Sequence, residues 1–294
     1  MMPMNEKPEA SLDALLPAAI ARKAEEIGVT KAGLDAPSTI VLAVLAGAFI
    51  ALGAVFATTV AAGAGGYLPF GVTRLLAGLV FSLGLILVIV GGAELFTGNN
   101  LIIMAWASRR VSSGRLLRNW ALVYAGNFVG AVGTAALVFA GGQYQFGRGA
   151  VGSAALEIAN AKVHFGVLEG VALGILCNGL VCLAVWLSYG ARSTSDKILA
   201  IVPPIAAFVT AGFEHSVANM YFLPTGLLIR AGAPDSFWTA IGKTPDDYPD
   251  LTWSNAVFAN LVPVTLGNII GGVVLVGAVY WFVFLRKQKN NPPV

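Results

Sequence analysis

The chain has 294 residues, of which 57% are hydrophobic and only 11% are charged, whereas charged residues make up about 25% of soluble domains. A soluble protein with this composition would expose apolar surface almost everywhere, so a protein with several membrane-spanning helices is the leading interpretation. The 18 basic and 15 acidic residues are nearly balanced, so no nucleic-acid partner is expected. Cys177 and Cys182, the only cysteines, lie in one apolar segment and are predicted to be packing residues, not a disulfide or a metal site.

The N-terminal residues 1–37 contain lysines, arginines and acidic residues but no unbroken apolar stretch of the kind that signal peptides have. They predict a cytoplasmic amphipathic helix that Ser11 caps and Gly28 ends. The apolar face of this helix would consist of Leu12, Leu15, Leu16, Ala19, Ile20 and Ile27. We expect it to pack against the protein or the membrane surface, with a gating role as the alternative.

Windows without charged residues predict the membrane crossings, because a helix needs about 20 apolar residues to cross the hydrocarbon core. The windows predict six crossings, at roughly 40–62, 73–107, 117–141, 165–190, 197–230 and 256–284. The second and fifth crossings are interrupted at Glu94 and Glu214. Irregular backbone at mid-membrane is tolerated only where it is buried in protein or lines a cavity. We therefore expect one transmembrane channel domain over residues 38–290, with helices 2 and 5 broken.

Two motifs occur twice, in the same order. The pattern G-x-E-x-x-x-x-N stands at Gly92–Asn99 and Gly212–Asn219, and the pattern N-x6-G-N-x-x-G stands at Asn119–Gly130 and Asn260–Gly271. The repetition predicts two related halves, at about 38–142 and 163–285. Each half has three crossings, so the second half must be inverted in the membrane, as in several transporters and channels.

The basic residues predict the orientation of the chain. If both termini are cytoplasmic, the cytoplasmic segments hold 13 of the 18 lysines and arginines and the outer loops hold 5. The excess of Lys and Arg on the cytoplasmic side therefore favours cytoplasmic termini.

The interruptions predict where an anion could bind. Each following half-helix begins with unpaired N–H groups and the positive end of its dipole, and inverted copies would direct both at one central region. Four side chains are predicted to cap these starts: Thr97, Asn99, Ser216 and Asn219. Glu94 and Glu214 are predicted to shape the loops, by accepting hydrogen bonds from loop N–H groups or by staying protonated.

His215 is the strongest candidate for a functional residue. It lies beside a glutamate inside a predicted mid-membrane break, where each ionisable group costs roughly 2.5–3.5 kcal/mol, and its side chain can exist in either charge state near neutral pH. The other histidine, His164, is predicted to be interfacial. No metal-binding cluster or nucleotide-binding loop is apparent, and Ser216 next to His215 is a poor nucleophile–base pair. We expect no enzymatic activity, no metal and no cofactor.

Several longer segments together resemble the formate/nitrite transporter family, and within it the formate channels. They are Phe81–Leu87, Glu94–Thr97, Leu176–Trp186, Gly212–Met220 and Asn260–Gly272. The resemblance covers nearly the whole chain, including Leu15–Ala19 and the long loop at 231–254. At Glu94, however, the formate channels have aspartate.

This resemblance implies an all-α, aquaporin-like bundle of six helices that forms a homopentamer in the lipid of the cell inner membrane, with a pore for formate in each protomer. It implies that His215 is the central histidine, Thr97 the loop threonine, Asn178 the pore asparagine and Lys162 the vestibule lysine. Glu214 and Asn219 are predicted to lie along the same pathway. The implied apolar constrictions are Phe81, Leu85, Leu95, Phe96 and Phe208.

The crossing species is the open question at this point. At pH 7 only about one molecule in a thousand is protonated if the carboxyl pKa is near 3.9, and a bare carboxylate crosses an apolar constriction poorly. Either His215 transfers a proton so that the neutral acid crosses, or a permanently cationic His215 offsets the anion's charge. The alternative substrates are nitrite, hydrosulfide or another small carboxylate, and both passive and proton-linked transport are compatible with the sequence.

Overall fold

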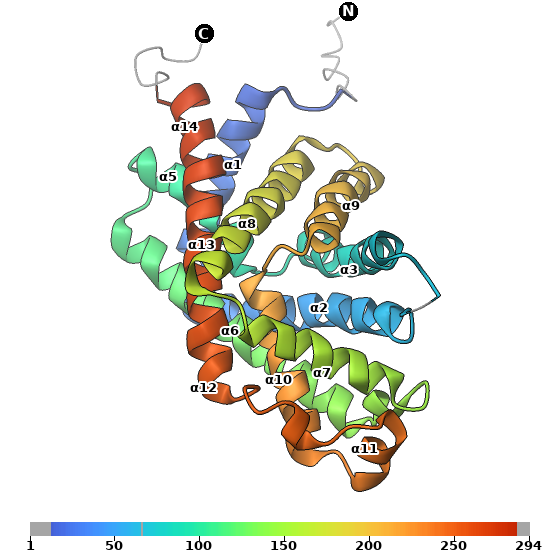
Figure 1. Cartoon of the computed structure of the whole chain (residues 1–294). Helices are drawn as coiled ribbons and strands as arrows, with labels where there is room; N and C mark the ends of the chain where they lie inside the picture. Colours follow the sequence, from blue (N-terminus) through green and yellow to red (C-terminus); the bar gives the residue numbers. More distant parts are fainter. Residues whose placement is uncertain (1–12, 66, 287–294) are drawn as a thin grey trace, which may run out of the picture.

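The computed structural model describes residues 13–65 and 67–286, and all regular secondary structure in these residues is helical. Six helices of the described chain are long and apolar enough to cross a membrane (Figure 1). They are α2 (Ala36–Ala61), α3 (Phe70–Gly91), α6 (Ser113–Ala140), α8 (Val167–Gly190), α9 (Thr194–Ala211) and the composite last helix over Trp253–Phe284. The predicted all-helical fold with six crossings is confirmed.

Shorter elements complete the chain. The half-helices that follow the two breaks are α4 (Phe96–Asn99), η1 (Asn100–Ile102) and α5 (Ile103–Ala107) in the first half, and α10 (Ser216–Gly232) in the second. The connecting elements are α1 (Pro17–Gly33), η2 (Gln143–Gln145), α7 (Ala150–Val163), α11 (Asp235–Ile241) and η3 (Pro245–Asp247). The last crossing consists of α12 (Trp253–Asn255), π-helical η4 (Ala256–Leu261), α13 (Val262–Ile270), π-helical η5 (Gly271–Ala278) and α14 (Val279–Phe284).

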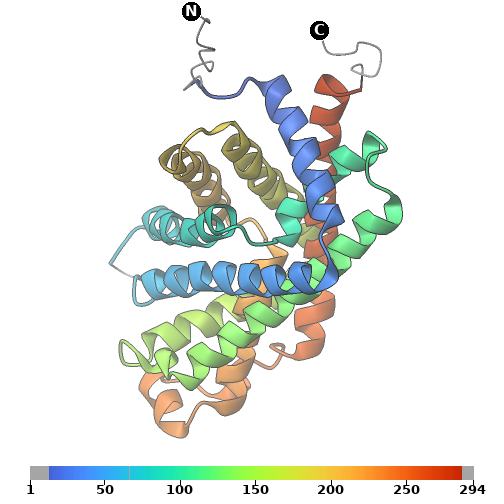
Figure 2. The ribbon, with the colours of Figure 1, turned by 180° about the vertical axis from the view of Figure 1, so that it is seen from behind.

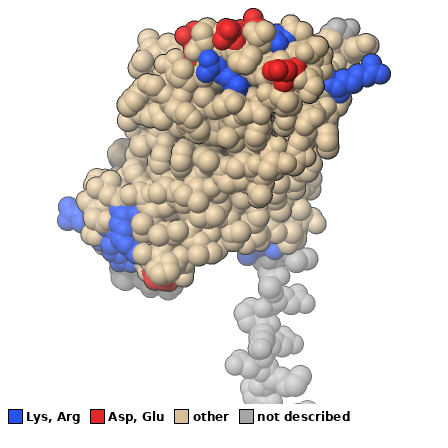
Figure 3. Space-filling view, turned by 90° about the horizontal axis from the view of Figure 1, so that it is seen from below, with Lys and Arg blue, Asp and Glu red and all other residues tan. Residues whose placement is uncertain are grey.

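The two termini of the described chain lie at one end of the molecule (Figure 1). The start of α1 and the end of α14 lie at the same end of the ribbon, and α11 lies at the opposite end (Figures 1 and 2). In the space-filling view, a broad band without charged residues separates charged groups at the two edges of the visible face (Figure 3). Such a band is expected where helices face lipid.

Both predicted breaks are present. Gly92, with φ 81°, directly follows α3, and Gly212, with φ 78°, directly follows α9. Glycine adopts this left-handed conformation without a Cβ penalty, which makes it a common helix terminator. An extended segment follows each glycine before α4 or α10 begins.

The two halves use their matching glycines in the same way. A Cβ atom at Gly130 would overlap the carbonyl oxygen of Val44 on α2, and one at Gly271 would overlap the carbonyl oxygen of Ile175 on α8. The repeated motif therefore contains glycine where α6 crosses α2 and where the last helix crosses α8 in backbone contact.

The N-terminal helix differs from its prediction. It begins at Pro17 and ends at Gly33, and Ser11 and Leu12 lie outside the described residues. Proline is favoured in the first turn of a helix, and Gly28 is an interior residue whose backbone packs on Ile102 and Ala105. The buried face consists of Ile20, Ala21, Ala24, Gly28 and Ala32. Small residues therefore form the contact, while Leu16 is 76% exposed.

Candidate functional site

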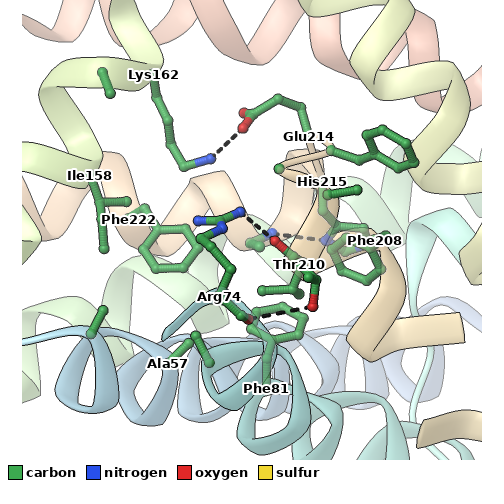
Figure 4. Close-up of a pocket in the computed structure, with 18 of the residues that line it drawn as sticks. Ala57, Arg74, Phe81, Ile158, Lys162, Phe208, Thr210, Glu214, His215 and Phe222 are labelled. Carbon is green, nitrogen blue, oxygen red and sulfur yellow. Dashed lines mark hydrogen bonds and ion pairs between the residues drawn. The ribbon is translucent and has the colours of Figure 1, made fainter. Parts of the chain in front are cut away.

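Two cavities enter the bundle from opposite ends of α3. The first, of about 430 Å³, is lined by the beginning of α3, by α7, by the loop after α9 and by α10, and we call it the Lys162 vestibule (Figure 4). The second, of about 320 Å³, is lined by α1, the end of α3 and the loop before α4, and we call it the Lys31 vestibule. The cavities share no lining residue. Phe81 lines the first and Leu85 the second, so one turn of α3 separates them.

The glutamate of the second break belongs to a buried cluster in the Lys162 vestibule. Lys162 Nζ lies 2.7 Å from Glu214 Oε1, and Asn219 Nδ2 donates to Glu214 Oε2 at 2.6 Å. Asn219 Nδ2 also donates to Asn260 Oδ1 at 2.7 Å, and Asn260 Nδ2 donates to the Lys162 carbonyl at 2.9 Å. The four residues come from α7, the break, α10 and the last helix, so the cluster joins four elements.

The first break has the same cluster, made from α1 instead of α7. Lys31 Nζ lies 2.6 Å from Glu94 Oε1, and Asn99 Nδ2 donates to Glu94 Oε2 at 2.7 Å and to Asn119 Oδ1 at 3.0 Å. Asn119 Nδ2 donates to the Lys31 carbonyl at 3.2 Å. Helix α1 therefore occupies in the first half the position that α7 occupies in the second, and each repeat contains one short helix more than the three predicted crossings.

These clusters correct the predicted hydrogen-bond partners of the glutamates. Within the described residues, each carboxylate accepts from lysine and asparagine side chains and not from loop N–H groups, and Glu214 accepts from both Asn219 and Asn260. A paired lysine makes the ionised carboxylate acceptable at this depth. Lys31 is not among the site residues predicted from the sequence. The available signal is the spacing along the chain. Lys31 precedes Leu42 by as many residues as Lys162 precedes Leu173. The carbonyls of these two leucines accept from the amides of Glu94 and Glu214.

The second asparagine of the N-x6-G-N-x-x-G motif fixes each break. Asn127 Oδ1 accepts from the Phe96 amide at 2.9 Å, while Nδ2 donates to the carbonyls of Ala43 at 2.7 Å and Glu94 at 2.9 Å. Asn268 makes the same three bonds in the second half, each at 2.9 Å. Its Oδ1 accepts from the Ser216 amide, and its Nδ2 donates to the carbonyls of Gly174 and Glu214. Each asparagine thereby bonds to one N–H and one carbonyl group of the break and to a carbonyl of a neighbouring unbroken helix, α2 or α8.

His215 lies between the two halves and is 3% exposed. Its Nδ1 accepts from the Ala218 amide at 3.0 Å, so the imidazole caps α10, and its Nε2 lies 2.9 Å from Thr97 Oγ1. A backbone N–H can only donate, so Nδ1 carries no proton in this arrangement. The ring is then neutral, with its proton on Nε2 and the Thr97 hydroxyl as acceptor.

The predicted capping residues have other partners. Asn99 and Asn219 bond to the glutamates, Thr97 bonds to His215, and Ser216 Oγ has no hydrogen-bond partner among the described residues. The capping prediction is therefore wrong, because the side chains with the required reach are His215 at the start of α10 and the asparagines of neighbouring helices.

Four of the five predicted constriction residues line the cavities. The rings of Phe81 and Phe208 meet edge to face at a centroid distance of 5.6 Å, and Phe208 stacks on His215 at 5.9 Å. Leu85 and Leu95 line the Lys31 vestibule. Phe96 lines neither cavity, because its ring packs edge-on against Tyr124 at 4.9 Å and Trp120 at 6.3 Å. The buried Phe96 side chain thus supports the loop from α6.

Asn178 lies behind the loop and lines neither cavity. Its Nδ2 donates at 2.7 Å to Asn100 Oδ1 and to the Asn268 carbonyl, and at 3.4 Å to the Thr97 carbonyl. The side chain is fully buried. Its observed place therefore suits a residue that holds the Thr97 loop.

The remaining candidates lie away from this centre. Cys177 and Cys182 are buried and free, as predicted for packing residues. His164 follows α7 and is exposed, with Nδ1 2.7 Å from the Asn160 carbonyl and Nε2 3.1 Å from Asp250. The hydrogen bond to the Asn160 carbonyl and then that to the Asp250 carboxylate raise the pKa of His164 above its ordinary value.

Arg74 is a second cation in the Lys162 vestibule. Its guanidinium donates to the carbonyl of Val209 at the end of α9. Arg74 is not among the site residues predicted from the sequence, although it lies at the start of the predicted crossing at 73–107. Its position at the beginning of a crossing was the available signal, because charged side chains within membrane segments tend to face water-filled cavities.

Sequence comparison finds proteins with related sequences over almost the whole chain. The family model described as formate/nitrite transporter matches residues 18–282. The formate channel FocA of Escherichia coli (strain K12) is 48% identical over 97% of this chain and 100% of its own length. The formate channel FocA of Haemophilus influenzae is 41% identical over 93% of this chain and 96% of its own length.

Solved structures have the same fold. A pentameric formate channel with formate bound matches with a TM-score of 0.81 and 45% sequence identity, over 85% of this chain and 98% of that chain. An ion channel described as belonging to the FNT family matches with a TM-score of 0.75 and 29% identity, over 90% of this chain and 98% of that chain.

Proposed function

The chain belongs to the formate/nitrite transporter family, and from this we propose that it conducts formate across the membrane through one pore in each protomer of a homopentamer. The observation that carries the proposal is the buried His215–Thr97 pair between two vestibules that approach it from opposite ends of α3. Its relatives include formate channels and a pentameric channel with formate bound, and these support the proposed substrate and assembly.

The proposed path begins at the vestibules and narrows towards His215. Lys162 and Asn219 line one vestibule, and Lys31 lines the other at the equivalent position of the first repeat. The Phe81–Phe208 contact and the Leu85 and Leu95 side chains form apolar slits on either side of the centre. A small anion is thus received by polar groups and then meets an apolar barrier.

The hydrogen bonds of His215 favour the neutral acid as the crossing species. Its Nδ1 already accepts the Ala218 amide, so the resting ring does not supply the permanent cation that an anion would need in the slits. The charge of formate is then cancelled by a proton that enters with it. In this mechanism one proton crosses with each formate. Between the two slits, the His215 Nε2–H group and the Thr97 hydroxyl bind the acid through hydrogen bonds.

Formate flux into proteoliposomes between pH 5 and 8 tests the mechanism, with the parent compared with His215→Asn. Above pH 5, the formic acid fraction falls about tenfold for each pH unit, since the carboxyl pKa is near 3.9. Asparagine has an oxygen at the position of Nδ1 and can still cap α10, but it lacks the Nε2–H group and cannot exchange a proton. If the neutral acid crosses, the fluxes of both proteins follow this tenfold slope, and His215→Asn is slower at every pH because it lacks the Nε2–H group that lies beside Thr97.

Other outcomes contradict separate parts of the proposal. Equal slopes and equal fluxes would make His215 a packing residue. Formate entry that carries current and brings no proton into the vesicle would identify an anion channel. If nitrite enters while formate does not, the substrate proposal fails although the family assignment stands.

We also propose that the protein lies in the cell inner membrane with both termini cytoplasmic, so that the Lys162 vestibule faces outward. The distribution of lysine and arginine supports this orientation. A cysteine introduced at exposed Thr244 should react with a membrane-impermeant maleimide in intact cells, because the native Cys177 and Cys182 are buried. Labelling only after cell disruption would show that residue 244 faces the cytoplasm and that the orientation is opposite to the proposed one.

A further inference from the structure

The two vestibules differ in charge although their lysine–glutamate pairs match. The charged residues that line the Lys31 vestibule are Lys31 and Glu94, which pair with each other. Those that line the Lys162 vestibule are Lys162 and Glu214, which also pair, together with Arg74 and Glu157. Glu157 pairs with Lys243, which lies outside the lining. Within the described chain Arg74 therefore adds a positive charge that no carboxylate neutralises at ion-pair distance.

The guanidinium of Arg74 has unused hydrogen-bond donors. One of its Nη atoms donates to the Val209 carbonyl, while Nε is buried and has no hydrogen-bond partner in the described part of the chain. An arginine side chain has five N–H donors in a planar fork that fits a carboxylate with two parallel bonds. Figure 4 shows this group inside the cavity, between the Lys162–Glu214 pair and the ring of Phe81.

Arg74 lies on α3 close to the slit that Phe81 and Phe208 form. Arg74 precedes Phe81 by two helical turns, which corresponds to about 10 Å along the axis, and both side chains line the same cavity. Its carbonyl partner, Val209, directly follows Phe208, the other ring of the slit. An anion held by Arg74 would therefore wait immediately outside the Phe81–Phe208 contact.

We propose that Arg74 forms an anion-binding site in the Lys162 vestibule that takes small planar oxyanions, carboxylates above all. The Lys31 vestibule has no equivalent unpaired cation among its lining residues. The inference rests on the proposed formate transport and adds an asymmetry to it. Formate entering through the Lys162 vestibule saturates transport at a lower concentration than formate entering through the Lys31 vestibule.

Flux from each side of uniformly oriented proteoliposomes tests this site, with Arg74→Gln as the main variant. Glutamine can still donate to the Val209 carbonyl but has no charge and no fork. Losing a charge-assisted hydrogen bond should raise the half-saturating formate concentration from the Lys162 side about tenfold or more, with less than about a twofold change from the Lys31 side. Arg74→Lys keeps the charge but not the fork and should lie between the parent and Arg74→Gln. Arg148→Gln is the matched control, because Arg148 is exposed and lines neither vestibule.

Saturation-transfer NMR with [13C]formate on the detergent-solubilised protein provides a readout that does not need transport. The formate signal should weaken in Arg74→Gln and persist in Arg148→Gln. If the parent transports no formate, the proposed function fails, and the NMR comparison still decides the binding site.

Three results would overturn the Arg74 site. The first is a parent that transports formate while Arg74→Gln leaves both half-saturating concentrations and the NMR signal unchanged. The second is an equal loss from both sides in Arg74→Gln and in Arg74→Lys, with a lower melting temperature, which would make Arg74 only a support for the end of α9. The third is an equal effect of Arg148→Gln, which would indicate general surface charge.

Discussion

The two lysine–glutamate clusters show which parts of an inverted repeat are free to diverge. Both contain a lysine, a glutamate and two asparagines in the same pattern of bonds. Lys31 Nζ, however, also donates to Asn99 Oδ1 at 3.0 Å, whereas Lys162 lies over the ring of Phe222 at 5.3 Å. Asn219 Oδ1 consequently has no hydrogen-bond partner in the residues that the structure describes. The backbone-fixing bonds are shared, and the groups that face the cavities differ.

The central histidine is the largest of these differences. When the two G-x-E-x-x-x-x-N motifs are superposed, His215 corresponds to Leu95. The backbone on both sides of the two residues is held by equivalent asparagines. The same backbone support can therefore present an imidazole in one half and an apolar side chain in the other.

The last crossing shows a related difference from α6. Helix α6 is α-helical over its whole length, whereas its counterpart contains π-helical η4 and η5. The carbonyl of Asn268, shortly before η5, accepts from the Asn178 side chain. Insertion of a side chain into the helical hydrogen-bond ladder is a known cause of such irregularity.

The largest expected effect comes from replacing the asparagine that holds the break in each half. Asn127→Leu and Asn268→Leu each remove the side-chain partner of two buried backbone groups of the break, at about 1–3 kcal/mol for each group. We expect both variants to lower the melting temperature of the detergent-solubilised protein strongly and by similar amounts. Thr134→Val, which removes only a bond within α6, is the control. A large loss in one variant alone would show that the repeats are not energetically equivalent.

The next effect distinguishes the two clusters. Lys162→Met leaves Glu214 buried without its ion partner, and removing one member of a buried pair costs about 3–5 kcal/mol. Lys31→Met should cost less, because the Lys31 side chain is 24% exposed and the Lys162 side chain 12%. Melting temperatures measure both variants. Adding Glu214→Gln to Lys162→Met should recover part of the stability, and the absence of any recovery would argue against an uncompensated carboxylate.

A smaller effect isolates the contact between the halves. Thr97→Val keeps the shape of the side chain but removes the oxygen that lies 2.9 Å from His215 Nε2. A buried N–H group without a partner costs about 1–3 kcal/mol, so we expect the formate flux in proteoliposomes to fall about tenfold. Thr225→Val is a buried control whose hydroxyl bonds within α10. Unchanged formate flux in Thr97→Val would show that the Thr97 hydroxyl takes no part in transport.

The smallest expected effect concerns the exposed end of α7. The folded-state pKa of His164 is raised by its bonds to Asn160 and Asp250, so this stabilisation is fully present below the unfolded pKa of about 6.5. It is lost as the pH rises through the folded pKa. Hydrogen exchange in residues 243–252, after correction for the intrinsic pH dependence, should therefore be slower at pH 6 than at pH 8. Asp250→Asn should reduce this difference, and an unchanged difference would assign it to other groups.

The sequence by itself determined the six crossings, the two breaks and the inversion. Charged residues are expensive at membrane depth, so windows without them appear directly in the sequence. The motif glycines predicted related halves because a left-handed helix end and a backbone contact both favour this one residue. The type of fold therefore followed from local composition and spacing.

Only the tertiary structure decided which side chains meet at the breaks. Lys31 and Glu94 lie on separate helices, Phe96 turns towards α6, and Asn178 lies behind the Thr97 loop. Sequence spacing defines the direction of a side chain around its own helix, but not which helix packs against that face. The cavity positions of Arg74 and His215 depend on helix crossings that join residues far apart in the chain, because burial and hydrogen bonding at those crossings select the partners.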